Sequence, residues 1–162
     1  MSDHDLQLLA QQLGERLLAR GRRLITAESC TGGWIAKVIT DLPGSSGWFE
    51  RGLVTYSNQA KQELLGVSAE TLERHGAVSE ATVREMAAGA LARAPADLAL
   101  AVSGIAGPGG GAPDKPVGTV WFAWGLRDGP LVTRREQLRG DRTEVRRQSV
   151  LIALQGGLDR LG

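Results

Sequence analysis

The run Leu98-Ala-Leu-Ala-Val102 is apolar at every position and lies between Pro95 and Gly104. Such a run predicts a short strand that is buried on both faces, as in the centre of a parallel or mixed sheet. A strand of this kind needs a layer of helices on each side to cover it. The run therefore favours an α/β architecture, and the rest of the chain can be read outward from it.

The segments on either side of this run alternate between strand-like and helix-like patterns. Together they predict one domain over residues 1–162, a layered α/β sandwich with one mixed sheet flanked by helices. Further strands are expected at Leu24–Ala27, Phe49–Tyr56, Thr119–Trp124 and Leu131–Gln137. Helices are expected over about 4–20, from Trp34 to before Pro43, from a cap at Ser57 or Asn58 to Gly66, from Ser79 to before Pro95, and after a cap at Asp141, with a helical turn near Ser68–Leu72.

Composition excludes several classes of protein. The chain has 162 residues, 42% hydrophobic and 23% charged, with a formal net charge of +1, which argues against a disordered chain and against one that coats nucleic acid. No apolar run approaches the roughly 20 residues of a membrane span, and the acidic N-terminus lacks a secretory pattern, so we expect a cytoplasmic protein. The single cysteine, Cys30, allows no internal disulfide and disfavours a structural zinc site.

Three unusual loops follow predicted strands: Glu28–Gly33, Tyr56–Lys61 and Ser103–Gly111. In open α/β sheets, ligands tend to bind at the carboxyl ends of the strands. The sequence therefore predicts that these three loops meet around one site.

The first loop offers a nucleophile where a strand turns into a helix. Helix N–H groups near Ser29 could hold an oxyanion, and Gly32 and Gly33 would let a substrate approach the backbone. The alternative is an ordinary helix cap by Ser29 or Thr31. Cys30 is a rival nucleophile, but only His75 could serve as its base, and free cysteines are more often buried as small hydrophobic residues.

Lys61 draws attention because the chain has only three lysines against 16 arginines. A buried lysine beside a serine can lose its proton near neutral pH and act as a general base. Lys61 could equally be a solvated surface lysine.

Gly104 and Gly107 suggest a backbone cradle for a polar ligand, although a flexible connection is an equal alternative. Arg142, at the start of the last predicted helix, suits a phosphate monoester. The alternative for the arginine-rich segment 134–147 is a solvated helix face and a charged edge strand.

Taken together, the motifs closely resemble the CinA C-terminal domain family, in particular its stand-alone nicotinamide-nucleotide amidases. The resemblance covers essentially the whole chain. The motifs that carry it are Thr26-Ala-Glu-Ser-Cys-Thr-Gly-Gly33, Gly44-Ser-Ser46, Val54-Thr-Tyr-Ser-Asn58 with Lys61, His75-Gly-Ala-Val-Ser79, Ser103-Gly-Ile-Ala-Gly-Pro-Gly-Gly110, Lys115-Pro-Val-Gly-Thr-Val120 and Gly140-Asp-Arg142.

The resemblance implies hydrolysis of nicotinamide mononucleotide to nicotinate mononucleotide and ammonia, in pyridine nucleotide recycling, without metal or cofactor. It also implies that Ser29 is the nucleophile and Lys61 its base. The other roles follow from chemistry alone and are expectations. They are Tyr56 to orient Lys61 or protonate the leaving ammonia, amides near Thr31, Gly32 and Gly33 with Ser103 or Gly104 for the oxyanion, Arg142 for the phosphate, and Ser46 for substrate contact or a turn.

Two rival functions remain. One is a non-hydrolytic, nucleotide-binding regulatory module of the CinA type, and the other is an amidase for a different pyridine or nucleotide amide. The balanced charge argues against direct DNA binding. We also expect a homodimer that pairs through apolar helix faces.

Overall fold

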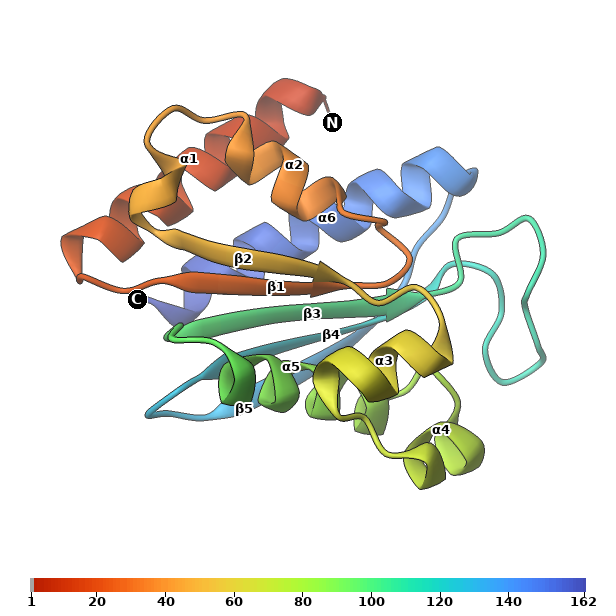
Figure 1. Ribbon diagram of the computed structural model, residues 1–162. Helices are drawn as coiled ribbons and strands as arrows, with labels where there is room; N and C mark the ends of the chain where they lie inside the picture. The colour runs from red at the N-terminus through yellow and green to blue at the C-terminus, as the bar shows by residue number, and fades with distance from the viewer. Residues whose placement is uncertain (1) are drawn as a thin grey trace.

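The computed structural model describes residues 2–162, which form a five-stranded sheet with helices on both faces (Figure 1). The strands are β1 (Leu24–Glu28), β2 (Phe49–Val54), β3 (Leu98–Gly104), β4 (Thr119–Leu126) and β5 (Leu131–Gln137). The helices are α1 (Asp3–Ala19), α2 (Trp34–Thr40), α3 (Asn58–Leu65), α4 (Ala69–His75), α5 (Glu80–Arg93) and α6 (Arg142–Arg160), with a 3₁₀ turn, η1 (Ser45–Gly47).

The strand order is β2-β1-β3-β4-β5, with β1 parallel to both β2 and β3. The β3–β4 and β4–β5 pairs are antiparallel, so the sheet is mixed. The predicted fold class is therefore confirmed. Because β1, β2 and β3 run in the same direction, their carboxyl ends lie at the same edge of the sheet.

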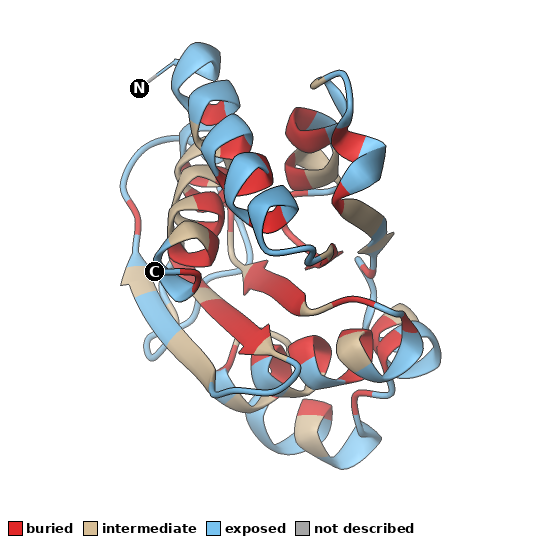
Figure 2. Cartoon of the chain, turned by 90° about the vertical axis from the view of Figure 1, so that its left-hand side faces the viewer, coloured by how far each residue is buried: buried red, intermediate tan, exposed pale blue. Residues whose placement is uncertain are grey.

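The two faces of the sheet are covered by different helices (Figure 1). In β3, Leu98, Leu100 and Val102 pack in a core cluster with residues of α1, α2 and α6, whereas Ala99 and Ala101 pack in a second cluster with α5. This alternation is the two-residue period of a strand that is buried on both faces. Figure 2 shows the buried residues of the helices turned toward the sheet.

Several boundaries differ from the predicted ones by a few residues. β3 continues through Gly104, so Ser103 and Gly104 are strand residues and not loop residues. β2 ends at Val54, short of Tyr56, and the predicted helical turn near Ser68 is the helix α4. The expected caps are confirmed where the Ser57, Ser79 and Asp141 side chains accept backbone hydrogen bonds at the starts of α3, α5 and α6.

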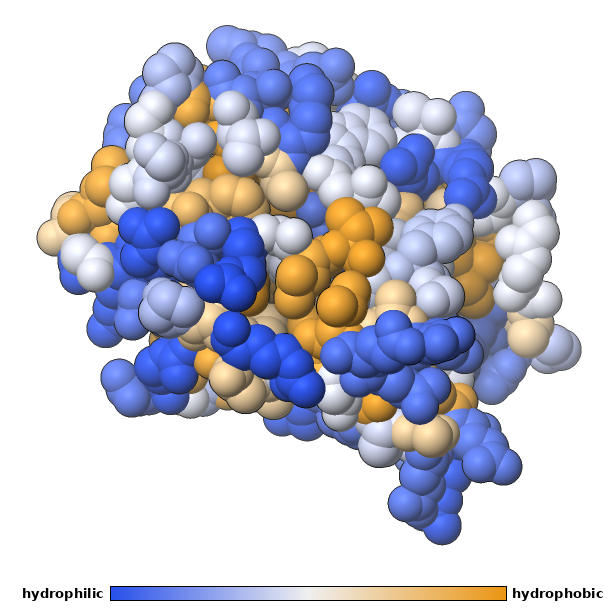
Figure 3. All heavy atoms as spheres, viewed as in Figure 1, coloured by the Kyte–Doolittle hydropathy of each residue, from blue (hydrophilic) through white to orange (hydrophobic). Residues whose placement is uncertain are grey.

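β2 forms one edge of the sheet and carries exposed apolar side chains at its carboxyl end. Val54 on β2 and Leu64 on α3 are 47% and 44% exposed. Figure 3 shows apolar surface near the middle of the view, where the end of β2 meets α3. The expected homodimer stays a prediction. Within residues 2–162, no helix combines the length and the apolar character that crossing a membrane requires.

Candidate active site

A cleft of about 280 Å³ opens at the carboxyl edge of β1, β2 and β3. Its size is near the lower end for small-molecule sites. It brings together six of the predicted site residues, from all three loops and from the start of α6. The lining residues are Ser29, Cys30, Tyr56, Lys61, Ala77, Val78, Ser103, Gly104, Ile105, Ala106, Gly107, Gly109, Gly110 and Arg142.

The centre of the cleft is a hydrogen-bonded pair, Ser29 and Lys61. Ser29 follows the last residue of β1, and Lys61 lies on α3, the first helix after β2. Lys61 Nζ lies 2.9 Å from Ser29 Oγ, 2.8 Å from the carbonyl oxygen of Thr55 and 3.4 Å from that of Tyr56. The topology thus brings the serine and the lysine, 32 residues apart in sequence, into direct contact.

Lys61 is only 1% exposed, so it is not the solvated surface lysine of the alternative reading. Burial lowers its pKa from 10.5 to about 8, because removal from water disfavours the ammonium form. Within residues 2–162, Lys61 forms no ion pair with a carboxylate, unlike Lys37, which pairs with Asp41. The neutral amine is therefore much more accessible near neutral pH in Lys61 than in an ordinary exposed lysine.

The start of α2 is capped by a residue that the sequence analysis did not single out. Glu28, the last residue of β1, is buried, and its carboxylate accepts hydrogen bonds from the N–H groups of Ile35 and Ala36 at 2.9 and 3.0 Å. Its Oε1 also accepts a 2.6 Å hydrogen bond from the Thr31 hydroxyl. The alternative of an ordinary cap by Ser29 or Thr31 is therefore wrong.

Thr31, Gly32 and Gly33 are not among the residues that line the cleft, so their predicted role at the oxyanion stays without support from it. The three residues line a separate hollow with Trp34 and Arg146, and not the cleft that holds Ser29. The N–H of Gly32 donates to the carbonyl oxygen of Ser29 at 3.0 Å, and Glu28 occupies N–H groups of the first turn of α2. The first turn of α2 is thus not the donor set that faces the cleft.

Other residues, whose backbone amides make no hydrogen bond within residues 2–162, line the cleft itself. Ala106, Gly107, Gly109 and Gly110 line the cleft, as does Cys30, the residue after Ser29. Among the described residues, none accepts a hydrogen bond from the backbone N–H of any of these five. Polar backbone that is unpaired and faces a cleft is available to a ligand.

Ser103 and Gly104 line the cleft as predicted, at the end of β3. Ser103 is 1% exposed. At Gly104 a Cβ atom would lie 2.7 Å from Val120 Cγ2 and 3.0 Å from the carbonyl oxygen of Thr119. The close approach of β4 therefore requires a glycine at position 104.

Arg142 joins two of the loops at the mouth of the cleft. Its Nη1 donates to the carbonyl oxygen of Gly107 at 2.7 Å, and its Nη2 donates to the Tyr56 hydroxyl at 3.1 Å. Tyr56 is 61% exposed, and its contact with Lys61 is made by its backbone carbonyl. The phenol is thus oriented by Arg142, and the expectation that the phenol orients Lys61 finds no contact within residues 2–162 to support it.

Cys30 is 6% exposed, and burial raises the pKa of its thiol to about 12. Because the thiolate is the nucleophilic form, a thiol with so high a pKa is a poor nucleophile near neutral pH. The high pKa therefore disfavours the alternative mechanism in which Cys30 attacks the substrate.

Ser46 does not line the cleft, so the cleft gives no support to its predicted contact with substrate, which stays a prediction. It lies in the η1 turn that precedes β2, and its carbonyl oxygen accepts a hydrogen bond from Arg23, the residue before β1. Since β1 and β2 are parallel, this places Ser46 at the amino-terminal edge of the sheet, opposite Ser29. The other expected role for Ser46, in a turn, agrees with this position.

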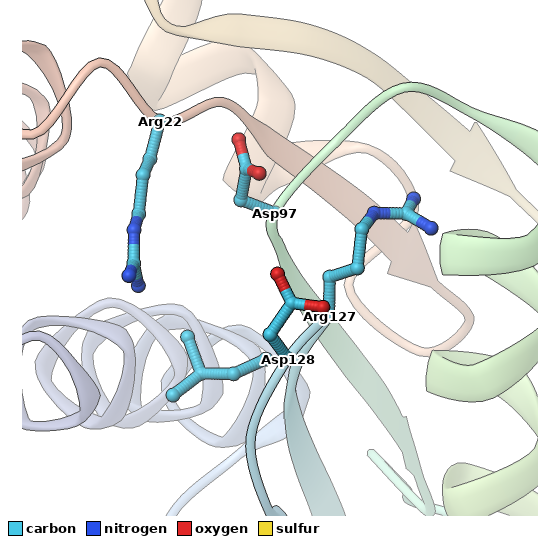
Figure 4. Close-up of a pocket in the computed structure, with 5 residues that line it drawn as sticks. Arg22, Asp97, Arg127 and Asp128 are labelled. Carbon is cyan, nitrogen blue, oxygen red and sulfur yellow. The ribbon is translucent and has the colours of Figure 1, made fainter.

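A smaller hollow, of about 120 Å³, lies at that same amino-terminal edge, beside Arg22, Asp97 and Asp128 (Figure 4). Arg127 also lines it, but the guanidinium points toward α5, where it donates to the carbonyl oxygens of Leu91 and Ala94. Asp97 accepts a hydrogen bond from the N–H of Arg23, so Asp97 and Arg127 join segments at this end of the sheet, and no nucleophile lines the hollow among the residues described.

The comparisons with known proteins agree with this fold. The model of the CinA C-terminal domain family matches residues 6–161. The chain is 61% identical over 155 residues to a nicotinamide-nucleotide amidohydrolase, PncC, of Escherichia coli, covering 96% of this chain and 94% of that protein. It is 55% identical over 149 residues to PncC of Pseudomonas putida, covering 91% and 92%. The crystal structure of a competence/damage inducible protein from Agrobacterium tumefaciens superposes with a TM-score of 0.94 at 46% identity, covering 97% of this chain and 95% of that one.

Proposed function

The chain belongs to the CinA C-terminal domain family, and from that premise we propose that it hydrolyses the carboxamide of nicotinamide mononucleotide. The products are nicotinate mononucleotide and ammonia, and the reaction would serve pyridine nucleotide recycling. Relatives named nicotinamide-nucleotide amidohydrolase, at 55–61% identity over nearly their whole length, support the substrate. The observation that carries the chemistry is the 2.9 Å contact between Lys61 Nζ and Ser29 Oγ inside the cleft.

The surroundings of Lys61 support its role as a base. A neutral amine has two N–H groups and one lone pair, whereas a carbonyl oxygen can only accept a hydrogen bond. The carbonyl oxygens of Thr55 and Tyr56 therefore take the two N–H groups. The lone pair is left for the third neighbour, the Ser29 hydroxyl, which can donate its proton to it.

The proposed reaction has two stages. Lys61 takes the proton of Ser29 as Oγ attacks the carboxamide carbon, and the tetrahedral intermediate collapses with protonation of its nitrogen by the Tyr56 hydroxyl, which releases ammonia and leaves the nicotinoyl group as an ester on Ser29. The Lys61 ammonium returns its proton to the tyrosinate through water, so that Lys61 is neutral again. Lys61 then takes a proton from a water molecule that attacks the ester and gives it to Ser29 Oγ as nicotinate mononucleotide leaves. We assign the oxyanion to the unpaired amides of Cys30 and the 106–110 loop, in place of those at 31–33.

Tyr56 is the candidate donor to the leaving ammonia. Its hydroxyl oxygen accepts a hydrogen bond from Arg142, so its own hydrogen remains free to donate into the cleft. Arg142 is the candidate phosphate ligand, since two of its N–H groups hold Gly107 and Tyr56 and the rest of its five are available. None of the described residues that line the cleft is acidic, which suits a substrate with an anionic phosphate.

Ammonia release from a panel of amides tests the function. The panel contains nicotinamide mononucleotide, the phosphate-free riboside, free nicotinamide and an unrelated nucleotide amide, and the variants are Ser29→Ala and Lys61→Arg. We expect turnover of the mononucleotide, with a loss of at least about 10³-fold in each variant, because arginine keeps the charge but cannot act as a base. Binding of the mononucleotide without turnover would favour the regulatory module, and turnover of another amide alone would favour the second rival.

A further inference from the structure

Arg146, on the second turn of α6, reaches the segment that carries the nucleophile. Its Nε donates to the carbonyl oxygen of Cys30 at 3.0 Å, and its Nη2 donates to that of Thr31 at 3.2 Å. These are the two residues that directly follow Ser29. Arg146 does not itself line the cleft, so its contacts act on the backbone behind the nucleophile.

The neighbouring Arg147 gives a direct comparison, because both guanidinium groups lie over the same ring. Arg146 is 5.6 Å and Arg147 5.4 Å from the centre of the Trp34 ring. Arg147 pairs with the carboxylates of Asp3 and Glu144. The ion pairs of the described chain do not include Arg146, whose hydrogen bonds go to the two carbonyl oxygens. Arg146 is thus directed at the nucleophile loop, whereas Arg147 is directed at two carboxylates.

The two hydrogen bonds fix the direction of two peptide planes. In a trans peptide the C=O and the following N–H point in opposite directions, so the N–H groups of Thr31 and Gly32 point away from Arg146. The N–H of Gly32 then donates to the carbonyl oxygen of Ser29 and closes the turn. With the backbone of Ser29 held in this way, one side-chain torsion sets the distance from its Oγ to Lys61.

The nucleophile and its base are therefore positioned from opposite faces of the sheet. Arg146 comes from α6, which packs with α1 and α2, and Lys61 comes from α3, which packs with α5 on the other face. We infer that Arg146 is a positioning residue: its hydrogen bonds to the carbonyl oxygens of Cys30 and Thr31 keep the Ser29 hydroxyl in contact with Lys61. This inference rests on the proposed function for its kinetic effect.

The kinetic test compares Arg146→Ala with Arg147→Ala. We expect Arg146→Ala to lower kcat for nicotinamide mononucleotide about 10²-fold, since a misplacement of about 1 Å costs that much, and to leave KM within about threefold. Arg147→Ala, which removes the other cation over Trp34, should keep kcat within about twofold. Arg146→Lys should recover part of the rate, and about 20 mM guanidinium ion should raise kcat of Arg146→Ala at least about fivefold and leave the unaltered protein unchanged.

Amide hydrogen exchange of the same proteins, measured without substrate, tests whether the hydrogen bonds of Arg146 order the nucleophile loop. We expect faster exchange at residues 30–35 in Arg146→Ala and no change there in Arg147→Ala. If Arg146→Ala does not fold, Arg146→Lys replaces it in both measurements. Equal rate losses in the two alanine variants, a change in KM alone, or unchanged exchange at residues 30–35 would overturn the inference. If the unaltered protein does not hydrolyse the mononucleotide, the proposed function fails, and the exchange measurement still decides whether Arg146 holds the loop.

Discussion

The backbone of Thr55 connects the end of β1 to Lys61. Its N–H donates to the carbonyl oxygen of Glu28 at 2.8 Å, and its carbonyl oxygen accepts from Lys61 Nζ at 2.8 Å. Glu28 is the residue before Ser29, so one residue directly after β2 sets the position of the base relative to the strand that precedes the nucleophile. Lys61 is thereby held in a buried position without a carboxylate partner within the described chain, and its protonation state becomes the main variable of the site.

The first prediction concerns the pH dependence of activity. Because the neutral amine is the base and its pKa is about 8, kcat/KM should rise about tenfold per pH unit below that value and level off above it. The measurement is ammonia release at low substrate concentration between about pH 6 and 9.5. Lys37→Ala, which removes an exposed lysine paired with Asp41, should leave the profile unchanged. A flat profile around pH 8 would contradict the role of Lys61.

The second prediction concerns the pH dependence of stability. The pKa of Lys61 is about 8 in the folded chain and 10.5 in the unfolded chain, so between these values the unfolded state binds more protons and the free energy of unfolding rises with pH. The buried charge of Lys61 lowers the free energy of unfolding by its full amount below pH 8 and no longer lowers it above pH 10.5. Urea unfolding of the unaltered protein and of Lys61→Met should show a difference that shifts by about 3 kcal/mol in favour of the unaltered protein between pH 7 and 10.5. Parallel pH dependences would show that Lys61 is not desolvated.

The third prediction separates Ser29 from its neighbour Cys30. Since Cys30 is buried and the pKa of its thiol is raised to about 12, Cys30→Ala should keep kcat/KM within about threefold. Iodoacetamide should label the folded protein at least about 100-fold more slowly than the urea-denatured chain, by intact mass. Rapid labelling accompanied by loss of activity would return Cys30 to consideration as the nucleophile.

The sequence predicted the parts of the fold that depend on local chemistry. Caps at Ser79, at Asp141 and at Ser57 or Asn58 are predictable because a side chain and an N–H three residues away decide a cap, and the structure shows Ser57 as the cap of α3. The central strand was identified because a continuous apolar run reports burial on both faces. Strand ends were missed by about two residues, since hydrogen bonding to a neighbouring strand decides where β3 ends, and its partners lie far away in sequence.

The site was predicted less completely, for the same reason. The cap by Glu28 spans seven residues to Ile35 and has no standard sequence signature, and Arg146 meets Cys30 across 116 residues. The position of Ser46 away from the cleft follows from the strand direction, which its motif alone does not give. A turn that precedes a strand parallel to β1 lies at the amino-terminal edge, whatever its sequence.

The fourth prediction concerns the phosphate. Arg142→Ala should raise KM for nicotinamide mononucleotide about 10–100-fold, the cost of losing a charge-assisted hydrogen bond, and should change kcat/KM for the phosphate-free riboside much less. Steady-state kinetics on both substrates make the comparison. Equal losses on the two substrates would mean that Arg142 acts through its contact with Gly107 and not through the phosphate.

Tyr56→Phe is the matched control for this measurement. It removes the hydroxyl that accepts from Arg142 but leaves the contact between Arg142 and Gly107. KM for the mononucleotide should therefore stay within about threefold, while kcat falls about 10²-fold if the phenol protonates the leaving ammonia. A raised KM with an unchanged kcat would instead make Tyr56 a support for Arg142.

The fifth prediction concerns the buried cap. Both carboxylate oxygens of Glu28 accept hydrogen bonds, from Thr31, Ile35 and Ala36. In Glu28→Gln an NH₂ group must replace one of these oxygens and face a donor, which leaves buried N–H or O–H groups unpaired at a cost of about 1–3 kcal/mol.

Thermal unfolding should therefore show a melting temperature that is lower by roughly 2–10 °C for Glu28→Gln. Glu70→Gln is the control, because Glu70 is 71% exposed and its ion pair with Arg74 contributes little to stability. The turnover of Glu28→Gln should also fall, since Thr31 and the start of α2, which follow Ser29, lose their hydrogen bonds to the Glu28 carboxylate. Equal melting temperatures for the two variants would mean that the carboxylate does not hold the nucleophile loop to the helix.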